Sequence, residues 1–77
     1  MLRFTPEYGA ILEANGVPMC KKPGVVWMEK VVEPFEVETN NGLMSADAGD
    51  FVAFDPISGH VWPVSDEYVA IHYEEMP

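Results

Sequence analysis

Basic residues are scarce in this chain of 77 residues, and all four of them lie within its first 30 positions. Thirteen aspartates and glutamates stand against these four lysines and arginines, which gives a formal net charge of −9 at pH 7. Direct binding of nucleic acid needs cationic side chains that displace phosphate counterions, so the composition argues against that class of function. We expect a charged partner to be a protein with a basic surface.

Cysteine and long apolar runs are rare as well. Cys20 is the single cysteine, so an intramolecular disulfide is impossible, and we expect its thiol to lie in the core as a small apolar group. No apolar run reaches the roughly 18 residues that a membrane span requires, and the first residues lack the apolar segment of a signal peptide. These absences lead us to expect a cytoplasmic protein that makes no contact with a membrane.

Sequence motifs of catalytic and metal sites are missing. The chain has no glycine-rich phosphate loop, no serine nucleophile elbow, and no cysteine and histidine pair at a known spacing. His60 and His72 lack the spacing of zinc ligands, and we expect each to be a half-exposed residue on a strand. Two carboxylates for acid–base chemistry could be chosen in many ways from thirteen, so no particular pair is indicated. We predict a protein that is not an enzyme and that has no catalytic, cofactor or metal site.

Apolar side chains, by contrast, make up 48% of the chain, which is enough to form the core of a single domain over residues 1–77. Thr5 is a favourable N-cap, Pro6 suits the first position of a helix, and Gly16 is a stop signal, so the sequence predicts a helix over 6–15. A helix this short is stable only against an apolar surface, and we therefore expect it to pack on the rest of the domain.

A β-rich body is predicted over residues 24–74, because short β-branched and aromatic runs alternate there with glycine, proline and asparagine turns. Asn41 and Gly42 indicate a type I′ hairpin turn, and residues 65–67 indicate a tight turn. Pro63 indicates that its strand lies at a sheet edge or ends there. The predicted strands cover 25–32, 35–39, 43–46, 51–54, 60–64 and 68–73. The expected architecture is α+β and mainly β: a short N-terminal helix packed on a small antiparallel meander that is curled into a barrel or half-barrel.

Large aromatic residues are expected to contribute to the core. The four that we assign to it are Trp27, Trp62, Tyr68 and Tyr73. Trp62 is the best candidate for partial exposure, because it precedes Pro63 on the predicted edge strand. Exposed tryptophan and tyrosine side chains are frequent hot spots of protein interfaces, so Trp62 is also a candidate partner-binding residue.

Acidic residues are concentrated after Lys30, since residues 31–77 contain ten of them and no lysine or arginine. Those on strands alternate with apolar neighbours and should point to solvent, and the others fall at predicted turns. Seven acids are candidate partner-binding residues: Glu36, Glu38, Asp47, Asp50, Asp55, Asp66 and Glu67. This charge either keeps the surface solvated or forms a face that docks on a basic partner, and the sequence leaves both interpretations open.

The run from Gly42 to Glu74 resembles the small phage and prophage domains that are built around a Pro-Gly-Asp-Tyr type motif. The matching residues are Gly49, Asp50 and Phe51 at the motif itself, followed by Gly59, Trp62, Pro63, Asp66, Tyr68, Tyr73 and Glu74. Residues similar to the opening of such domains are Lys22, Pro23, Val25 and Val26. The resemblance implies a viral or mobile-element setting in the cytoplasm of a host cell, and it implies no assigned activity.

Two hypotheses of function follow from these patterns. In the first, the chain is an accessory module that binds another protein through an edge strand or an aromatic patch around Trp62. In the second, it is an acidic inhibitor that imitates a nucleic-acid backbone and occupies the basic site of a defence or replication protein with the seven acids named above. Salt separates the two, because binding by the mimic weakens steeply as ionic strength rises.

Overall fold

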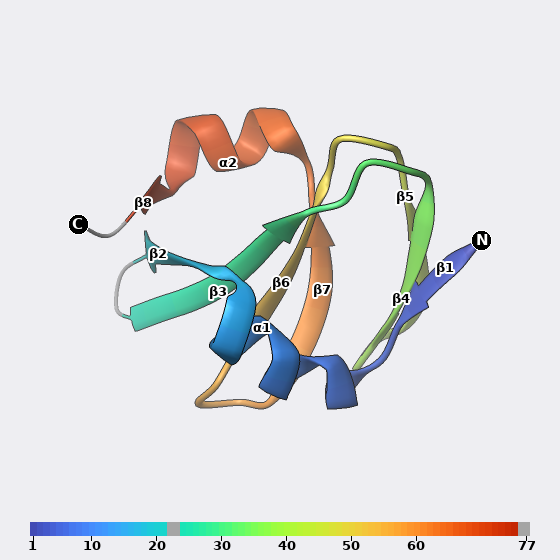
Figure 1. Cartoon of the computed structure of the whole chain (residues 1–77), viewed down its shortest axis with the longest axis horizontal. Helices are drawn as coiled ribbons and strands as arrows, with labels where there is room; N and C mark the ends of the chain where they lie inside the picture. The colour runs from blue at the N-terminus through green and yellow to red at the C-terminus, as the bar shows by residue number, and fades with distance from the viewer. Residues whose placement is uncertain (22–23, 76–77) are drawn as a thin grey trace.

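The computed structural model describes residues 1–21 and 24–75, and over these residues the chain forms eight strands and two α-helices (Figure 1). The N-terminal part contains β1 (Leu2–Phe4), a 3₁₀ turn (Pro6–Tyr8), α1 (Gly9–Asn15) and β2 (Val17–Lys21). The middle part contains β3 (Gly24–Lys30), β4 (Phe35–Thr39), β5 (Gly42–Ala46) and β6 (Phe51–Asp55). The C-terminal part contains β7 (His60–Val64), α2 (Asp66–His72) and β8 (Glu74–Glu75).

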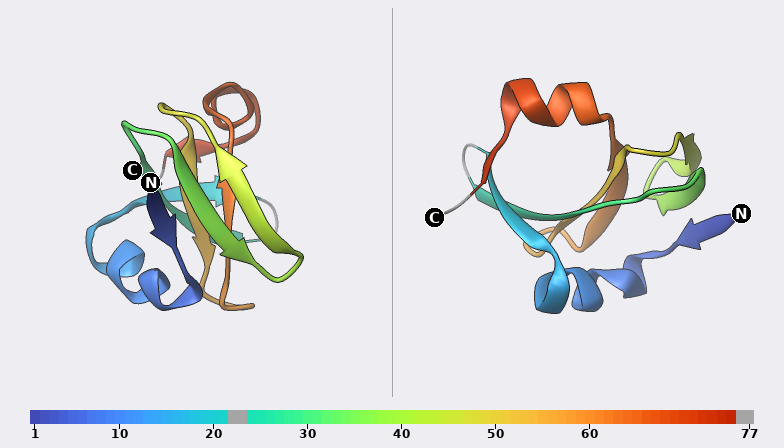
Figure 2. Two further views of the ribbon diagram at one scale, coloured as in Figure 1. Left: turned by 90° about the vertical axis from the view of Figure 1, so that its right-hand side faces the viewer. Right: turned by 45° about the horizontal axis from the view of Figure 1, so that its top comes forward.

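These strands form two sheets. The larger sheet has the order β7-β6-β3-β2-β8, and all of its neighbouring strands are antiparallel. The smaller sheet has the order β1-β4-β5, in which β1 runs parallel to β4. Figure 2 shows the larger sheet curled, and over the described residues it does not close into a barrel. The predicted class, α+β and mainly β with a short N-terminal helix on a sheet curled into a half-barrel, is confirmed. The strands do not form the simple antiparallel meander that was predicted, because β3 pairs with β6 and β1 runs parallel to β4.

Both faces of the five-stranded sheet are buried. Val52 of β6 belongs to one apolar cluster, together with Phe35 of β4 and Leu12 of α1. The next residue, Ala53, belongs to a second cluster that includes Val69 of α2. Successive residues of a strand point to opposite faces, so the smaller sheet and α1 cover one face and α2 covers the other. This double cover explains why β6 is apolar at consecutive positions and does not alternate with polar residues.

The predicted helix over 6–15 is confirmed in position, although its first turn is a 3₁₀ turn. Leu12 is buried in the cluster between the two sheets. Gly9 is buried as well, and a Cβ atom added there would overlap the ring of Phe54. Close approach of α1 to β6 therefore accounts for a glycine inside a helix, where it is otherwise unfavourable.

The last predicted strand, 68–73, and the tight turn predicted before it are wrong. These residues form α2, and Ser65 is its N-cap, whose Oγ accepts a hydrogen bond from the backbone N–H of Tyr68 (3.1 Å). Two acidic residues occupy the first turn of the helix, where the positive end of the helix dipole favours them. The sequence predicts a strand here because β-branched and aromatic residues favour one, despite the capping signals at the start of the segment. Only Glu74–Glu75 forms a strand in this region.

Three smaller predictions are also wrong. Asn41 does not have a positive φ, so the β4–β5 turn is not type I′, and Gly42 has the positive φ of 107° instead. Cys20 is exposed, because Met19 takes the core-facing position on β2. His72 lies on α2 and not on a strand.

Candidate functional site

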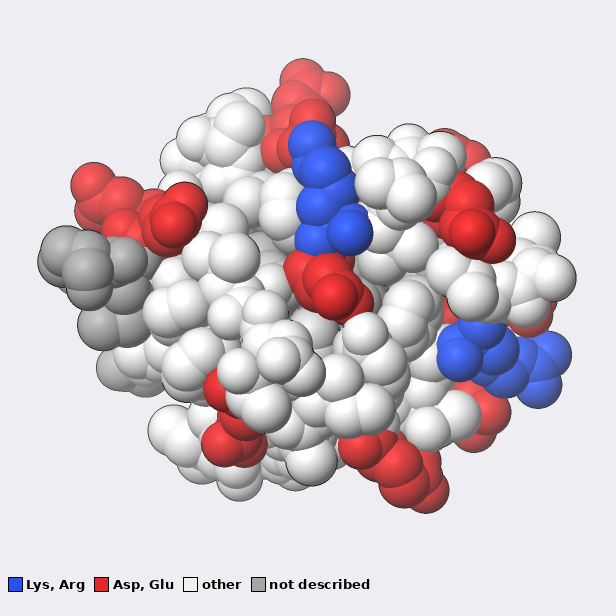
Figure 3. All heavy atoms as spheres, viewed as in Figure 1, with Lys and Arg blue, Asp and Glu red and all other residues white. Residues whose placement is uncertain are grey.

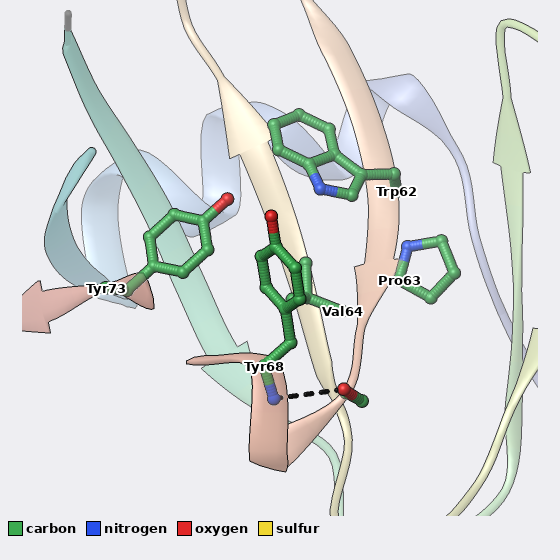
Figure 4. A pocket seen from close by; sticks show the side chains of 6 residues that line it. Trp62, Pro63, Val64, Tyr68 and Tyr73 are labelled. Atoms are coloured by element: carbon green, nitrogen blue, oxygen red, sulfur yellow. Dashed lines mark hydrogen bonds between the residues drawn. The ribbon is translucent and has the colours of Figure 1, made fainter. Parts of the chain in front are cut away.

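An open pocket lies between β7 and α2, and we call it the β7–α2 pocket. Its volume is about 260 Å³, slightly below the range of roughly 300–1,000 Å³ that is typical of small-molecule sites. Trp62, Tyr68 and Tyr73 contribute aromatic rings to its lining. Figure 4 shows both tyrosine hydroxyls projecting toward the side on which the Trp62 indole lies. The other lining residues are Pro63, Val64 and Ser65.

Strand β7 positions Trp62 at this pocket. As predicted, the strand is an edge of its sheet, and it carries Pro63, which has no backbone N–H to donate to a neighbour. The cross-strand partner of Trp62 is Ala53, a buried small residue that leaves space for an indole above the sheet. Trp62 is half-buried, which confirms its predicted partial exposure.

Helix α2 and the residue after it supply the two tyrosines. Val69 is the buried residue of the helix and packs in the cluster on the sheet, whereas Tyr68 is 44% exposed. The predicted core position of Tyr68 is therefore wrong. The ring centroids of Tyr68 and Tyr73 are 6.1 Å apart with an interplanar angle of 55°, and His72 packs on Tyr68 with a centroid distance of 4.2 Å. Because this segment is a helix and not the predicted strand, Tyr68 and Tyr73 both line one pocket.

Acidic residues neighbour the pocket in the sequence, although its six lining residues carry no charged side chain. Four exposed acids flank these residues in the sequence: Asp66, Glu67, Glu74 and Glu75. Lys30 compensates part of this charge, because its Nζ lies 3.3 Å from Oδ1 of Asp66. The other three acids are exposed on α2 and β8, next to lining residues in the sequence, and their negative charge would attract a cationic group to this part of the molecule.

Asp50 has a structural role that was not predicted. Its Oδ2 accepts a hydrogen bond from the backbone N–H of Asp47 (3.1 Å) in the turn before β6. Its Oδ1 accepts a hydrogen bond from the backbone N–H of Asp66 (3.3 Å), the first residue of α2. One carboxylate therefore joins this turn to the N-terminus of the helix that forms the pocket, where N–H groups lack partners within the helix.

The seven candidate partner-binding acids do not gather on one surface. Four lie near the start of α2, where the Asp50 carboxylate accepts hydrogen bonds from the backbone of Asp47 and Asp66: Asp47, Asp50, Asp66 and Glu67. Asp55 lies at the opposite end of β6, where its Oδ1 accepts a hydrogen bond from the backbone N–H of Ile57 (2.9 Å). Glu36 and Glu38 lie on β4 of the smaller sheet, and Glu36 forms an ion pair with Arg3 (3.2 Å). Figure 3 accordingly shows the acidic side chains of one face as separate groups.

A further polar contact joins the 3₁₀ turn to β3. The hydroxyl of Tyr8 donates a hydrogen bond to Oε1 of Glu29 (2.6 Å). Burial of the ring, this hydrogen bond and the negative charge of Glu29 together raise the pKa of Tyr8 to about 12. In an unfolded chain the pKa of tyrosine is about 10.

Raising the pH from 10 to 12 is therefore expected to destabilise the wild-type protein more than a Tyr8→Phe variant. In this range the unfolded state has lost the Tyr8 proton and the folded state has kept it, so the stability present below pH 10 is lost as the pH rises through the folded pKa. Urea unfolding of both proteins at a series of alkaline pH values measures the difference. Equal loss of stability in the two proteins would contradict the raised pKa.

Among the described residues, no group of three or more histidine, cysteine, aspartate or glutamate side chains is placed to hold a metal ion. Within residues 1–21 and 24–75, no helix is long and apolar enough to cross a membrane. Comparison of the chain with protein-family models, with curated proteins and with solved structures finds no match. The resemblance to phage domains therefore stays a prediction, and Lys22 and Pro23, which contribute to it, lie outside the described residues.

Proposed function

We propose that this chain is a non-enzymatic interaction module that binds a protein with a basic surface through the β7–α2 pocket. The observation that supports this function is an open pocket lined by Trp62, Tyr68 and Tyr73 in a chain with a net charge of −9. Tryptophan and tyrosine are the residues most enriched, with arginine, at interface hot spots. The acids beside the pocket attract a basic partner and accelerate its approach. In the setting that the phage resemblance implies, the partner is a protein of the infected cell.

Replacing Trp62 by alanine is expected to weaken partner binding at least tenfold, because truncation of a central aromatic residue has an effect of that size in known interfaces. Immobilised wild-type protein would first capture a partner from the natural host at low salt. The affinity of the purified pair would then be measured by calorimetry. Retention of wild-type affinity by Trp62→Ala would show that the pocket is not the binding surface.

A matched control is available at the other end of β7. Ile57 is 87% exposed in the loop before this strand and does not line the pocket. Ile57→Ala removes a large apolar side chain outside the pocket, and we expect this variant to bind the partner as tightly as the wild type. Equal weakening by both substitutions would indicate a non-specific loss of apolar surface.

The alternative function, an acidic mimic of nucleic acid, predicts a different dependence on charge. Glu67→Gln with Glu74→Gln removes two charges beside the pocket, and Glu36→Gln with Glu38→Gln removes two charges from β4. For the proposed module, the first pair slows association several-fold and the second pair has little effect. A larger effect of the β4 pair, with a steep dependence on salt and little effect of Trp62→Ala, would favour the mimic.

A further inference from the structure

The β7–α2 pocket has the composition of a binding site for an organic cation. The faces of aromatic rings attract cations through the ring quadrupole, and tryptophan does so most strongly. Trp62, Tyr68 and Tyr73 place three such rings around one space (Figure 4). Packing of His72 on Tyr68, at a centroid distance of 4.2 Å, restricts the orientation of one of these rings. The volume of about 260 Å³ suits the end of one side chain more than a large ligand.

The lining of the pocket discriminates among cations. A lysine ammonium carries three N–H donors and an arginine guanidinium carries five, and burying such donors without acceptors is costly. None of the six lining residues has a carboxylate, so the side-chain acceptors at the pocket are neutral hydroxyl oxygens: those of Tyr68 and Tyr73, and Oγ of Ser65, which already accepts a hydrogen bond from the backbone N–H of Tyr68 (3.1 Å). A trimethylammonium group has no N–H donor and presents methyl groups to the rings. A lining without a carboxylate therefore suits a methylated cation, which needs no hydrogen bonds, better than an unmethylated one.

The acidic residues beside the pocket complete this arrangement. Glu67 and Glu74 lie close in sequence to the lining residues on either side and are exposed. They attract a positive charge through space, which does not require hydrogen bonds to the bound group. Methylation of a lysine keeps its charge, so a methylated side chain retains this attraction.

We infer that the β7–α2 pocket binds a trimethylated lysine side chain of the partner protein. This inference rests on the proposed function, because it names the group of the partner that enters the pocket. The trimethylammonium group lies among the three aromatic rings, and the exposed acids of α2 and β8 attract its charge.

Short peptides test this inference directly. The probe is a glycine-rich peptide that carries one trimethyllysine. Two comparison peptides carry unmodified lysine or the neutral analogue in which carbon replaces the ammonium nitrogen. Binding is followed through the backbone amide and indole N–H resonances of the isotope-labelled protein. We expect the trimethyllysine peptide to bind and the neutral analogue to bind about three- to thirtyfold more weakly, as the strength of a cation–π contact predicts. The unmodified peptide is also expected to bind more weakly.

Variants of the protein test whether the peptide binds in the pocket. Tyr68→Ala and Trp62→Ala are both expected to weaken binding of the trimethyllysine peptide, whereas Ile57→Ala leaves it unchanged. Tyr68 is 44% exposed, so Tyr68→Ala tests the pocket without removing a core residue. The amide spectrum of each variant reports whether it is folded.

Several results would overturn the inference. If the neutral analogue bound as tightly as the trimethyllysine peptide, the pocket would recognise shape alone. If the unmodified lysine peptide bound as tightly, the pocket would not distinguish methylated from unmethylated lysine. Binding of choline in the absence of peptide binding would identify a small-molecule cation as the ligand. A partner that binds through Trp62 while the trimethyllysine peptide does not bind would overturn this inference and leave the proposed function standing.

Discussion

Truncation of Phe35 to alanine is expected to lower the free energy of unfolding by about 3–5 kcal/mol. Phe35 is fully buried on β4, and its ring meets the ring of Phe4 edge to face with a centroid distance of 5.5 Å. It lies in the cluster that joins the smaller sheet to the larger one, so alanine would leave a cavity between them. A domain of this size has a total stability of only about 4–12 kcal/mol. The variant should therefore lose a large fraction of its total stability.

Urea unfolding followed by tryptophan fluorescence measures this loss. Leu43 on the neighbouring strand β5 supplies the control, because it is 50% exposed and Leu43→Ala should change the stability by no more than about 0.5 kcal/mol. A loss below about 1 kcal/mol for Phe35→Ala would mean that the two sheets do not pack across this ring.

The second large effect is expected for Asp50→Ala, which should cost about 2–3 kcal/mol. The carboxylate accepts hydrogen bonds from two backbone N–H groups, and hydrogen bonds to a charged group contribute about 1.5–3 kcal/mol each when well shielded from water. Asp50 is only half-buried, so we expect less than the sum of two such bonds. The N-terminus of α2 loses an acceptor at the same time. Hydrogen exchange should therefore become faster at the backbone N–H of Asp66.

Asp47→Ala is the matched control for Asp50→Ala. It removes the same charge from the same turn but keeps both bonds, since Asp47 takes part in this contact through its backbone N–H. We expect its stability to stay within about 0.5 kcal/mol of the wild type. Equal losses for the two variants would show that charge in the turn, and not the hydrogen bonds of Asp50, determines the effect.

Individual strands were predictable where local pattern and tertiary structure agree. The run 60–64 coincides with β7, and 51–54 differs from β6 by one residue, because turn residues bound each apolar run. The order of the strands has no such local signal. β3 pairs with β6, while the β4–β5 hairpin between them in the sequence belongs to the other sheet. Pairing of this kind depends on which apolar faces cover one another across the whole domain.

The candidate site was predictable only in part. The sequence indicates Trp62 as a partner-binding residue because the adjacent Pro63 marks an edge strand, and this signal is local. Tyr68 and Tyr73 lie beside Trp62 because α2 runs from β7 at one edge of the sheet to β8 at the other, and composition had indicated a strand for this segment. The role of Asp50 depends on a hydrogen bond to a residue 16 positions away, and no short-range pattern indicates such a contact.

The two edges of the five-stranded sheet have a consequence for association between copies of the chain. β7 carries Pro63, which interrupts the row of N–H donors along that edge, and β8 consists of the two glutamates Glu74 and Glu75. A strand from a second molecule would find few hydrogen-bonding positions at β8, because β8 has only two residues. If that strand were the β8 of another copy, its glutamates would be repelled by Glu74 and Glu75. Growth of this five-stranded sheet from one molecule to the next is therefore disfavoured at both of its edges.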